Sequence, residues 1–162
     1  MAGTRSKLRK EYANTLQMVW DEWNTPVWRE GGPFFNLSDH PDLDSDADYN
    51  HAIGWIVGVS EWTGWPLIPG EKKTRKVMHP KELREMFEQR LAEAWKGYLE
   101  KSSISGSPFH NLEDVPELDT DADFNFLIGW LIGVSQVTGW ALDPVGPREW
   151  SPRGWKGIKD RG

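Results

Sequence analysis

The chain has 162 residues, a formal net charge of -6 at pH 7 and 38% hydrophobic residues. This combination suffices for one ordinary hydrophobic core and excludes a chain that is disordered throughout. Cysteine is absent, which excludes disulfides, thiolate metal sites and cysteine nucleophiles. The longest apolar runs, residues 52–59 and 126–134, are far shorter than the roughly 20 residues of a membrane-spanning helix. No apolar stretch typical of a signal peptide follows the basic N-terminal residues, so we expect a soluble cytoplasmic protein without a membrane span.

A sequence repeat with an offset of 75 residues is the main feature of the chain. Residues 8–67 align with residues 83–142 without a gap, and 27 of the 60 aligned positions are identical. Self-similarity at a fixed offset predicts a tandem duplication in which each copy is one structural unit. We expect the two copies to form one globular domain. The predicted parts are repeat 1 (residues 5–67), a basic linker (68–82), repeat 2 (83–142) and a basic tail rich in Gly, Pro and Trp (143–162).

The first predicted element of each repeat is an amphipathic helix, because apolar residues recur there at spacings of three and four. The apolar stripe consists of Leu8, Tyr12, Leu16, Trp20 and Trp23 in repeat 1 and of Leu83, Phe87, Leu91, Trp95 and Tyr98 in repeat 2. A long loop follows this helix in both repeats. Loops of such length in compact domains are often functional.

The second predicted element of each repeat is a helix that is apolar around most of its circumference, as in "IGWIVGV" and "IGWLIGV". In repeat 1, Ser45 and Asp48 resemble a capping box with aspartate in place of glutamate, which starts the helix. The equivalent pair in repeat 2, Thr120 and Asp123, starts the second helix there. Gly64 and Gly139 have the position of helix-terminating glycines in the left-handed conformation.

Two glycines inside each of these second helices predict a close contact between them. A glycine in a helix interior costs roughly 1 kcal/mol relative to alanine, so a compensating packing reason is expected. Close approach of the two helix backbones at Gly54, Gly58, Gly129 and Gly133 supplies that reason. The predicted fold is therefore all-α: two helix–long loop–helix units packed as a pseudo-twofold four-helix domain, followed by an irregular C-terminal tail.

An acidic cluster precedes the second helix of each repeat and is a candidate cation site or docking surface. Its members are Asp44, Asp46, Asp48 and Asn50 in repeat 1 and Asp119, Asp121, Asp123 and Asn125 in repeat 2. The spacing resembles a calcium loop, but positions six and twelve are Ala47 and Ile53 instead of glycine and glutamate. Carboxylates at a helix start also bind the free amide groups there, and Asn and Asp commonly brace loops. We therefore predict helix caps and loop braces and no metal, with a cation-binding module as an alternative.

No catalytic residue is predicted, because the repeats do not bring together an acid, a base and a nucleophile. No histidine of one repeat aligns with a histidine of the other. The repeated Ser60 and Ser135 lack a neighbouring base, and we expect them to be small packing residues. No glycine-rich phosphate-binding loop is present. We therefore expect a protein that is not an enzyme and needs no cofactor.

Aromatic residues that break the repeat are the candidate partner-binding residues. The chain has eleven tryptophans, and those without an aromatic counterpart in the other repeat are not required by a common fold. Tryptophan and arginine are enriched among the residues that anchor interfaces. The candidate set is Trp28, Trp62, Trp150, Trp155, Arg148 and Arg153.

The sequence favours a non-catalytic binding or structural subunit that docks into a larger protein assembly through its tail and the unmatched aromatics. One alternative has Trp150 and Trp155 fold back over the protein's own core. Another is a small-molecule binding protein with a pseudo-symmetric aromatic pocket, for which a nucleotide is one candidate ligand. Nucleic-acid binding is less favoured, because the acidic net charge opposes the basic segments.

Overall fold

The computed structural model describes residues 2–101 and 106–143, and it is all-helical there, which confirms the predicted all-α class. The four long helices are α1 (Ala2–Trp23), α3 (Ala47–Thr63), α4 (Pro80–Lys101) and α6 (Ala122–Thr138). The loop after α1 contains the 3-10 helix η1 (Leu37–Asp39) and the short helix α2 (Pro41–Asp44), and the loop after α4 contains η2 (Leu112–Asp114) and α5 (Pro116–Asp119). None of the helices in the described residues is both long enough and apolar enough to cross a lipid bilayer.

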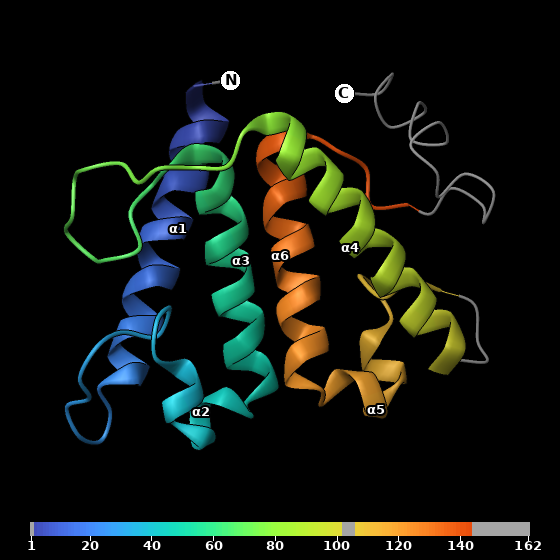
Figure 1. The fold of residues 1–162 in the computed structure, drawn as a ribbon, viewed down its shortest axis with the longest axis horizontal. Coiled ribbons are helices and arrows are strands. Elements are labelled where there is room, and N and C mark those ends of the chain that lie inside the picture. Colours follow the sequence, from blue (N-terminus) through green and yellow to red (C-terminus); the bar gives the residue numbers. More distant parts are fainter. Residues whose placement is uncertain (1, 102–105, 144–162) are drawn as a thin grey trace.

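The two central helices, α3 and α6, lie side by side in the middle of the molecule (Figure 1). Helix α1 packs beside α3, and α4 packs beside α6 (Figure 1). Positions that meet across the central pair advance together along both helices: Gly54 faces Phe126, and Gly58 faces Trp130. The helices α3 and α6 are therefore parallel.

Main chain meets main chain at the contact between α3 and α6, as the four glycines predicted. A Cβ atom placed on Gly54 would collide with the carbonyl oxygen of Phe126, and one on Gly129 would collide with that of His51. A Cβ atom on Gly58 would lie 2.5 Å from the Trp130 carbonyl oxygen. Any side chain at these positions would therefore separate the helices, which explains why glycine is present despite its low helix propensity.

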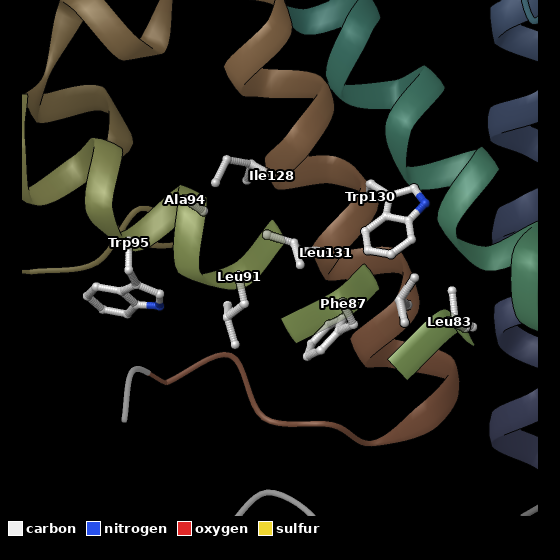
Figure 2. Packing of buried hydrophobic residues seen from close by; sticks show 9 residues of the cluster. Leu83, Phe87, Leu91, Ala94, Trp95, Ile128, Trp130 and Leu131 are labelled. Carbon is white, nitrogen blue, oxygen red and sulfur yellow. The ribbon is translucent and has the colours of Figure 1, made fainter. Parts of the chain in front are cut away.

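The outer helices bury the apolar stripes that their spacing predicted. Figure 2 shows Leu83, Phe87 and Leu91 of α4, which belong to the same buried cluster as Ile128 and Leu131 of α6. On the other side, Tyr12 and Leu16 of α1 pack with Trp55, Ile56 and Val59 of α3. The Tyr12 hydroxyl also donates a hydrogen bond of 2.8 Å to the Pro66 carbonyl oxygen.

The start of each central helix differs from the predicted capping box. The N-cap residues are Asp46 and Asp121, and each carboxylate accepts a hydrogen bond from the backbone N–H three residues later. The Ser45 hydroxyl instead donates to the Pro41 carbonyl oxygen at 2.6 Å, and Thr120 does the same to Pro116. The capping-box prediction was wrong because it overlooked α2 and α5, whose last turns occupy both hydroxyls. Proline at the first helical position is the signal that could have revealed these short helices.

The end of each central helix is the predicted one. Gly64 and Gly139 adopt left-handed conformations with φ of 79° and 82°. The Ser60 hydroxyl donates a hydrogen bond of 2.6 Å to the Trp65 carbonyl oxygen, and Ser135 makes the equivalent bond to Trp140. These two serines are therefore not merely small packing residues, because their hydroxyls hold the turn that follows the helix.

We expect Gly58→Ala to lower the free energy of unfolding by about 1–3 kcal/mol through overpacking, despite the higher helix propensity of alanine. The matched control is Gly97→Ala in α4, where the added Cβ would meet only the edge of the Phe124 ring at 3.1 Å, which can move. Thermal unfolding measures both, and the expected decrease for Gly58→Ala is roughly 2–12 °C. Equal midpoints for the two variants would show that the helix contact is not tight.

Candidate functional site

A groove of about 770 Å³ opens between the loop of residues 33–37, helix α3, helix α4 and the first half of α6. Pro33 and Ile53 of its apolar lining are buried, and the other apolar lining residues are only partly buried. The partly buried residues include Phe34, Leu37, Val57, Phe124, Phe126 and Leu127. The loop, α3 and α6 thus contribute apolar side chains to one concave surface that still contacts solvent, while α4 contributes Arg90, Glu93 and Gly97.

Charged side chains border this groove. Glu93, Asp121 and Asp123 line it and are exposed to solvent. The Arg90 guanidinium lies over the Trp130 ring, 4.4 Å from the ring centroid. Burial lowers the pKa of Arg90, while the negative charges of Glu93 and Glu61 oppose this shift. Arginine remains cationic at neutral pH, so the lining carries three carboxylates and one guanidinium.

The acidic clusters cap the central helices and surround two buried asparagines. The Nδ2 atom of Asn50 lies within hydrogen-bonding distance of the carbonyl oxygens of Leu43, Asp44 and Asp46, at 3.2, 2.9 and 2.9 Å. Asn125 makes the equivalent three contacts in the second half. Each amide therefore ties the short helix and the following turn to the start of the central helix, as the loop-brace prediction stated.

The remaining carboxylates of these clusters do not converge on a common point. Asp44, Asp48 and Asp123 are exposed, and Asp119 is partly buried. Within residues 2–101 and 106–143, no group of three or more His, Asp or Glu side chains is arranged to hold a metal ion. The described structure therefore gives the cation-binding alternative no ligand set.

We expect Asn50→Asp to lower the free energy of unfolding by at least about 1–3 kcal/mol, because a carboxylate cannot donate to the three carbonyl oxygens that it would face. Asn14→Asp, at an exposed position of α1, is the control and should be nearly neutral. Urea denaturation with and without calcium measures both. An Asn50→Asp protein that calcium restores to full stability would contradict the brace and indicate a cation site.

The predicted aromatic anchors have different environments. Trp28 is 76% exposed in the loop after α1. Trp62 is partly buried, and its ring packs edge-on against Trp140 with 5.8 Å between the centroids. The other four candidates, Trp150, Trp155, Arg148 and Arg153, lie outside the described residues. The structure does not bring Trp28 and Trp62 together in the groove, because neither residue lines it.

The sequence-based prediction missed an exposed phenylalanine and the groove itself. Phe35 is 69% exposed, although its counterpart in the other repeat is His110, so it also breaks the repeat. The rule for unmatched aromatics would have found Phe35 if it had covered phenylalanine as well as tryptophan. The groove residue Arg90 aligns with Thr15, and a second groove residue, Phe126, aligns with His51. Positions at which the two repeats differ were thus the sequence signal that could have indicated the groove residues.

His51 shows how the two halves differ at aligned positions. Burial lowers the pKa of His51, and the nearby Asp48 carboxylate opposes this shift. A histidine whose pKa is lowered by folding binds a proton more readily in the unfolded chain. Its contribution to stability is therefore complete above the unfolded pKa of about 6.5 and is lost as the pH falls below that value.

We expect the free energy of unfolding to decrease between pH 7.5 and pH 5.5, with His51 contributing up to about 1 kcal/mol of the decrease. His51→Phe, which introduces the residue of the aligned position 126, should remove that contribution. His79→Phe, at an exposed linker position, is the control and should keep the pH dependence of the unmodified protein. Urea titrations at the two pH values measure the difference, and identical slopes for all three proteins would contradict the assignment.

Comparison of the chain with protein-family models, with curated proteins and with solved structures finds no match.

Proposed function

We propose that the protein is a non-catalytic binding subunit that docks into a larger protein assembly, with the groove between α3, α4 and α6 as its main docking site. One observation carries this proposal: Phe34, Phe124, Phe126 and their apolar neighbours line a concave surface yet remain partly open to solvent. Burial of apolar area stabilises a complex by roughly 25 cal/mol per Å² before the costs of association. A partner that inserts apolar side chains into the groove would therefore form the most stable complex.

The charges at the groove define the partner further. Glu93, Asp121 and Asp123 favour basic side chains on the partner, while the apolar lining of the groove favours aromatic or aliphatic ones. We therefore propose a partner segment in which tryptophan, phenylalanine or leucine alternates with lysine or arginine. Such a segment would place its apolar side chains in the groove and its charges at the rim.

The exposed aromatics extend the proposed contact surface. Trp28 and Phe35 are both more than two-thirds exposed, and large aromatic side chains are frequent interface anchors. Phe35 also borders a smaller pocket of about 230 Å³ together with residues of the linker such as Lys73 and Arg75. The tail tryptophans belong to the same proposal, although they lie outside the described residues.

We also propose that the scaffold arose by tandem duplication and packs about a pseudo-twofold axis. The 27 identical positions support this, as does the recurrence of the same element order in both halves. The glycine contacts support it too: Gly54 faces residue 126 while Gly129 faces residue 51, and both pairs obey the 75-residue offset. We propose a cytoplasmic location on the basis of the sequence alone.

A small molecule is the second candidate ligand of the same groove. The groove volume of about 770 Å³ lies in the range of roughly 300–1,000 Å³ that is usual for small-molecule sites. Arg90 lines the groove and lies over the ring of the buried Trp130, so a ligand that displaces the guanidinium would change tryptophan fluorescence. A fluorescence screen therefore separates this candidate from a protein partner.

The test of the docking proposal is selection of binding peptides from a displayed library with the full-length chain. We expect enriched peptides that combine aromatic and basic residues. The groove variant Phe126→His with Leu127→Ala carries the residues of the aligned positions 51 and 52, so the fold tolerates the same pair in its other half. This variant should bind the peptides at least about tenfold more weakly, because it loses two anchors.

The matched control is the reciprocal variant, His51→Phe with Ala52→Leu, which changes no groove-lining residue. It should bind the peptides like the unmodified chain. Peptides that bind both double variants equally would place the docking site elsewhere. Failure to enrich any peptide, together with a small molecule whose binding the groove variant abolishes, would replace the docking proposal with the second candidate.

A further inference from the structure

We propose that the groove is occupied by the protein's own C-terminal segment, residues 144–162, which a partner segment must displace. This inference rests on the groove being a docking site, as proposed above, and it adds the regulation of that site. It follows from the chemistry of the segment, from the charge of the groove and from the point at which the described chain ends.

The C-terminal segment has the composition that the groove requires. It contains five basic residues and two acidic ones, which gives a net charge of +3. It also contains Trp150 and Trp155, separated by four residues that include one proline and one arginine. The segment thus combines large aromatic anchors with basic flanking residues.

The groove is complementary to the C-terminal segment in charge and in its apolar lining. The three carboxylates of Glu93, Asp121 and Asp123 and the single guanidinium of Arg90 leave its lining with a net charge of -2. All three carboxylate residues are exposed, so basic side chains can approach them from solvent. The aromatic rings of Phe34, Phe124 and Phe126 offer edges and faces against which an indole ring can pack.

The end of the described chain lies on the helix that forms one wall of the groove. The Leu142 carbonyl oxygen accepts a hydrogen bond of 2.8 Å from Nε1 of Trp95 in α4. Gly97, two residues further along the same helix, lines the groove. The seven residues 144–150 can span about 23 Å when extended, whereas a helix with its side chains is about 10–12 Å across. Trp150 can therefore pass around α4 and reach the groove.

Attachment to the same chain favours this occupant over a second copy of the protein. A segment attached to the same chain through a short linker typically has an effective concentration in the millimolar range. A second copy at micromolar concentration competes poorly with it. The consequence is selectivity: a partner segment binds only if its affinity exceeds that of the tethered one.

The absence of cysteine from the chain permits a direct test with the full-length protein. Leu127→Cys places a thiol in the groove, and Ser151→Cys places one next to Trp150. We expect oxidised glutathione to join them within one chain at least tenfold faster than it joins a control pair, Asn14→Cys with Ser151→Cys. Asn14 is exposed on α1 and does not line the groove. Non-reducing gel electrophoresis and mass spectrometry measure both rates.

Two additions keep the test decisive. Val57→Cys is a second groove probe in case Leu127→Cys does not fold, since Val57 lines the groove from α3. Adding Trp150→Ala and Trp155→Ala should slow closure of the groove disulfide to the control rate. Equal rates for groove and control pairs would overturn the inference, and disulfides that join two chains would overturn it in favour of a second copy.

Failure of this inference is distinguishable from failure of the docking proposal. Peptide binding is measured for the unmodified chain and for the chain with Trp150→Ala and Trp155→Ala, which should bind at least tenfold more tightly. If peptides bind both forms equally and the disulfide rates are equal, the tethered-segment inference fails and the docking proposal stands. If the groove disulfide forms rapidly but neither form binds any peptide, the docking proposal fails and the segment is a permanent part of the fold.

Discussion

Backbone contact between α3 and α6 at four glycines is the constraint on which the remaining structure depends. Because Gly54 and Gly129 admit no side chain between the helices, the central pair forms a narrow two-helix unit. The apolar residues on the remaining faces of this unit then need covering, which α1 and α4 provide (Figure 1). Neither outer helix covers a whole face, and the groove is the part of the apolar surface beside α4 that stays open.

Features that depend on a short stretch of chain were predictable from the sequence. The end of α3 at Gly64 was predictable, because a left-handed glycine stops a helix by local geometry. The close helix contact was predictable from Gly58 and its aligned counterpart, because glycine in two apolar helices needs a packing reason. The start of α3 was misplaced by one residue, since Ser45 and Asp46 are both good caps and only the position of α2 decides between them.

The groove could not be predicted, because its lining comes from segments that are distant in sequence. Phe34 lies in a loop, Arg90 in α4 and Phe126 in α6, and only the packing of α4 across the central pair brings them together. Within the sequence of α6 alone, Phe126 resembles a core residue, and only its aligned counterpart His51 distinguishes it. The sequence did identify Asp121, but as a member of the acidic cluster at the start of a helix. In the structure Asp121 caps α6 and also borders the groove.

Differences between the aligned halves carry information that the identical positions do not. Gly54 and Gly129 are the same in both halves because main chain meets main chain at the helix contact. Position 126 has phenylalanine where position 51 has histidine, and position 127 has leucine where position 52 has alanine. Since the fold accepts the smaller or more polar residue in one half, it does not require the larger apolar residue in the other. Partly exposed apolar side chains that the fold does not require are a cost to solubility, and the proposed binding role would supply a physical reason for their presence.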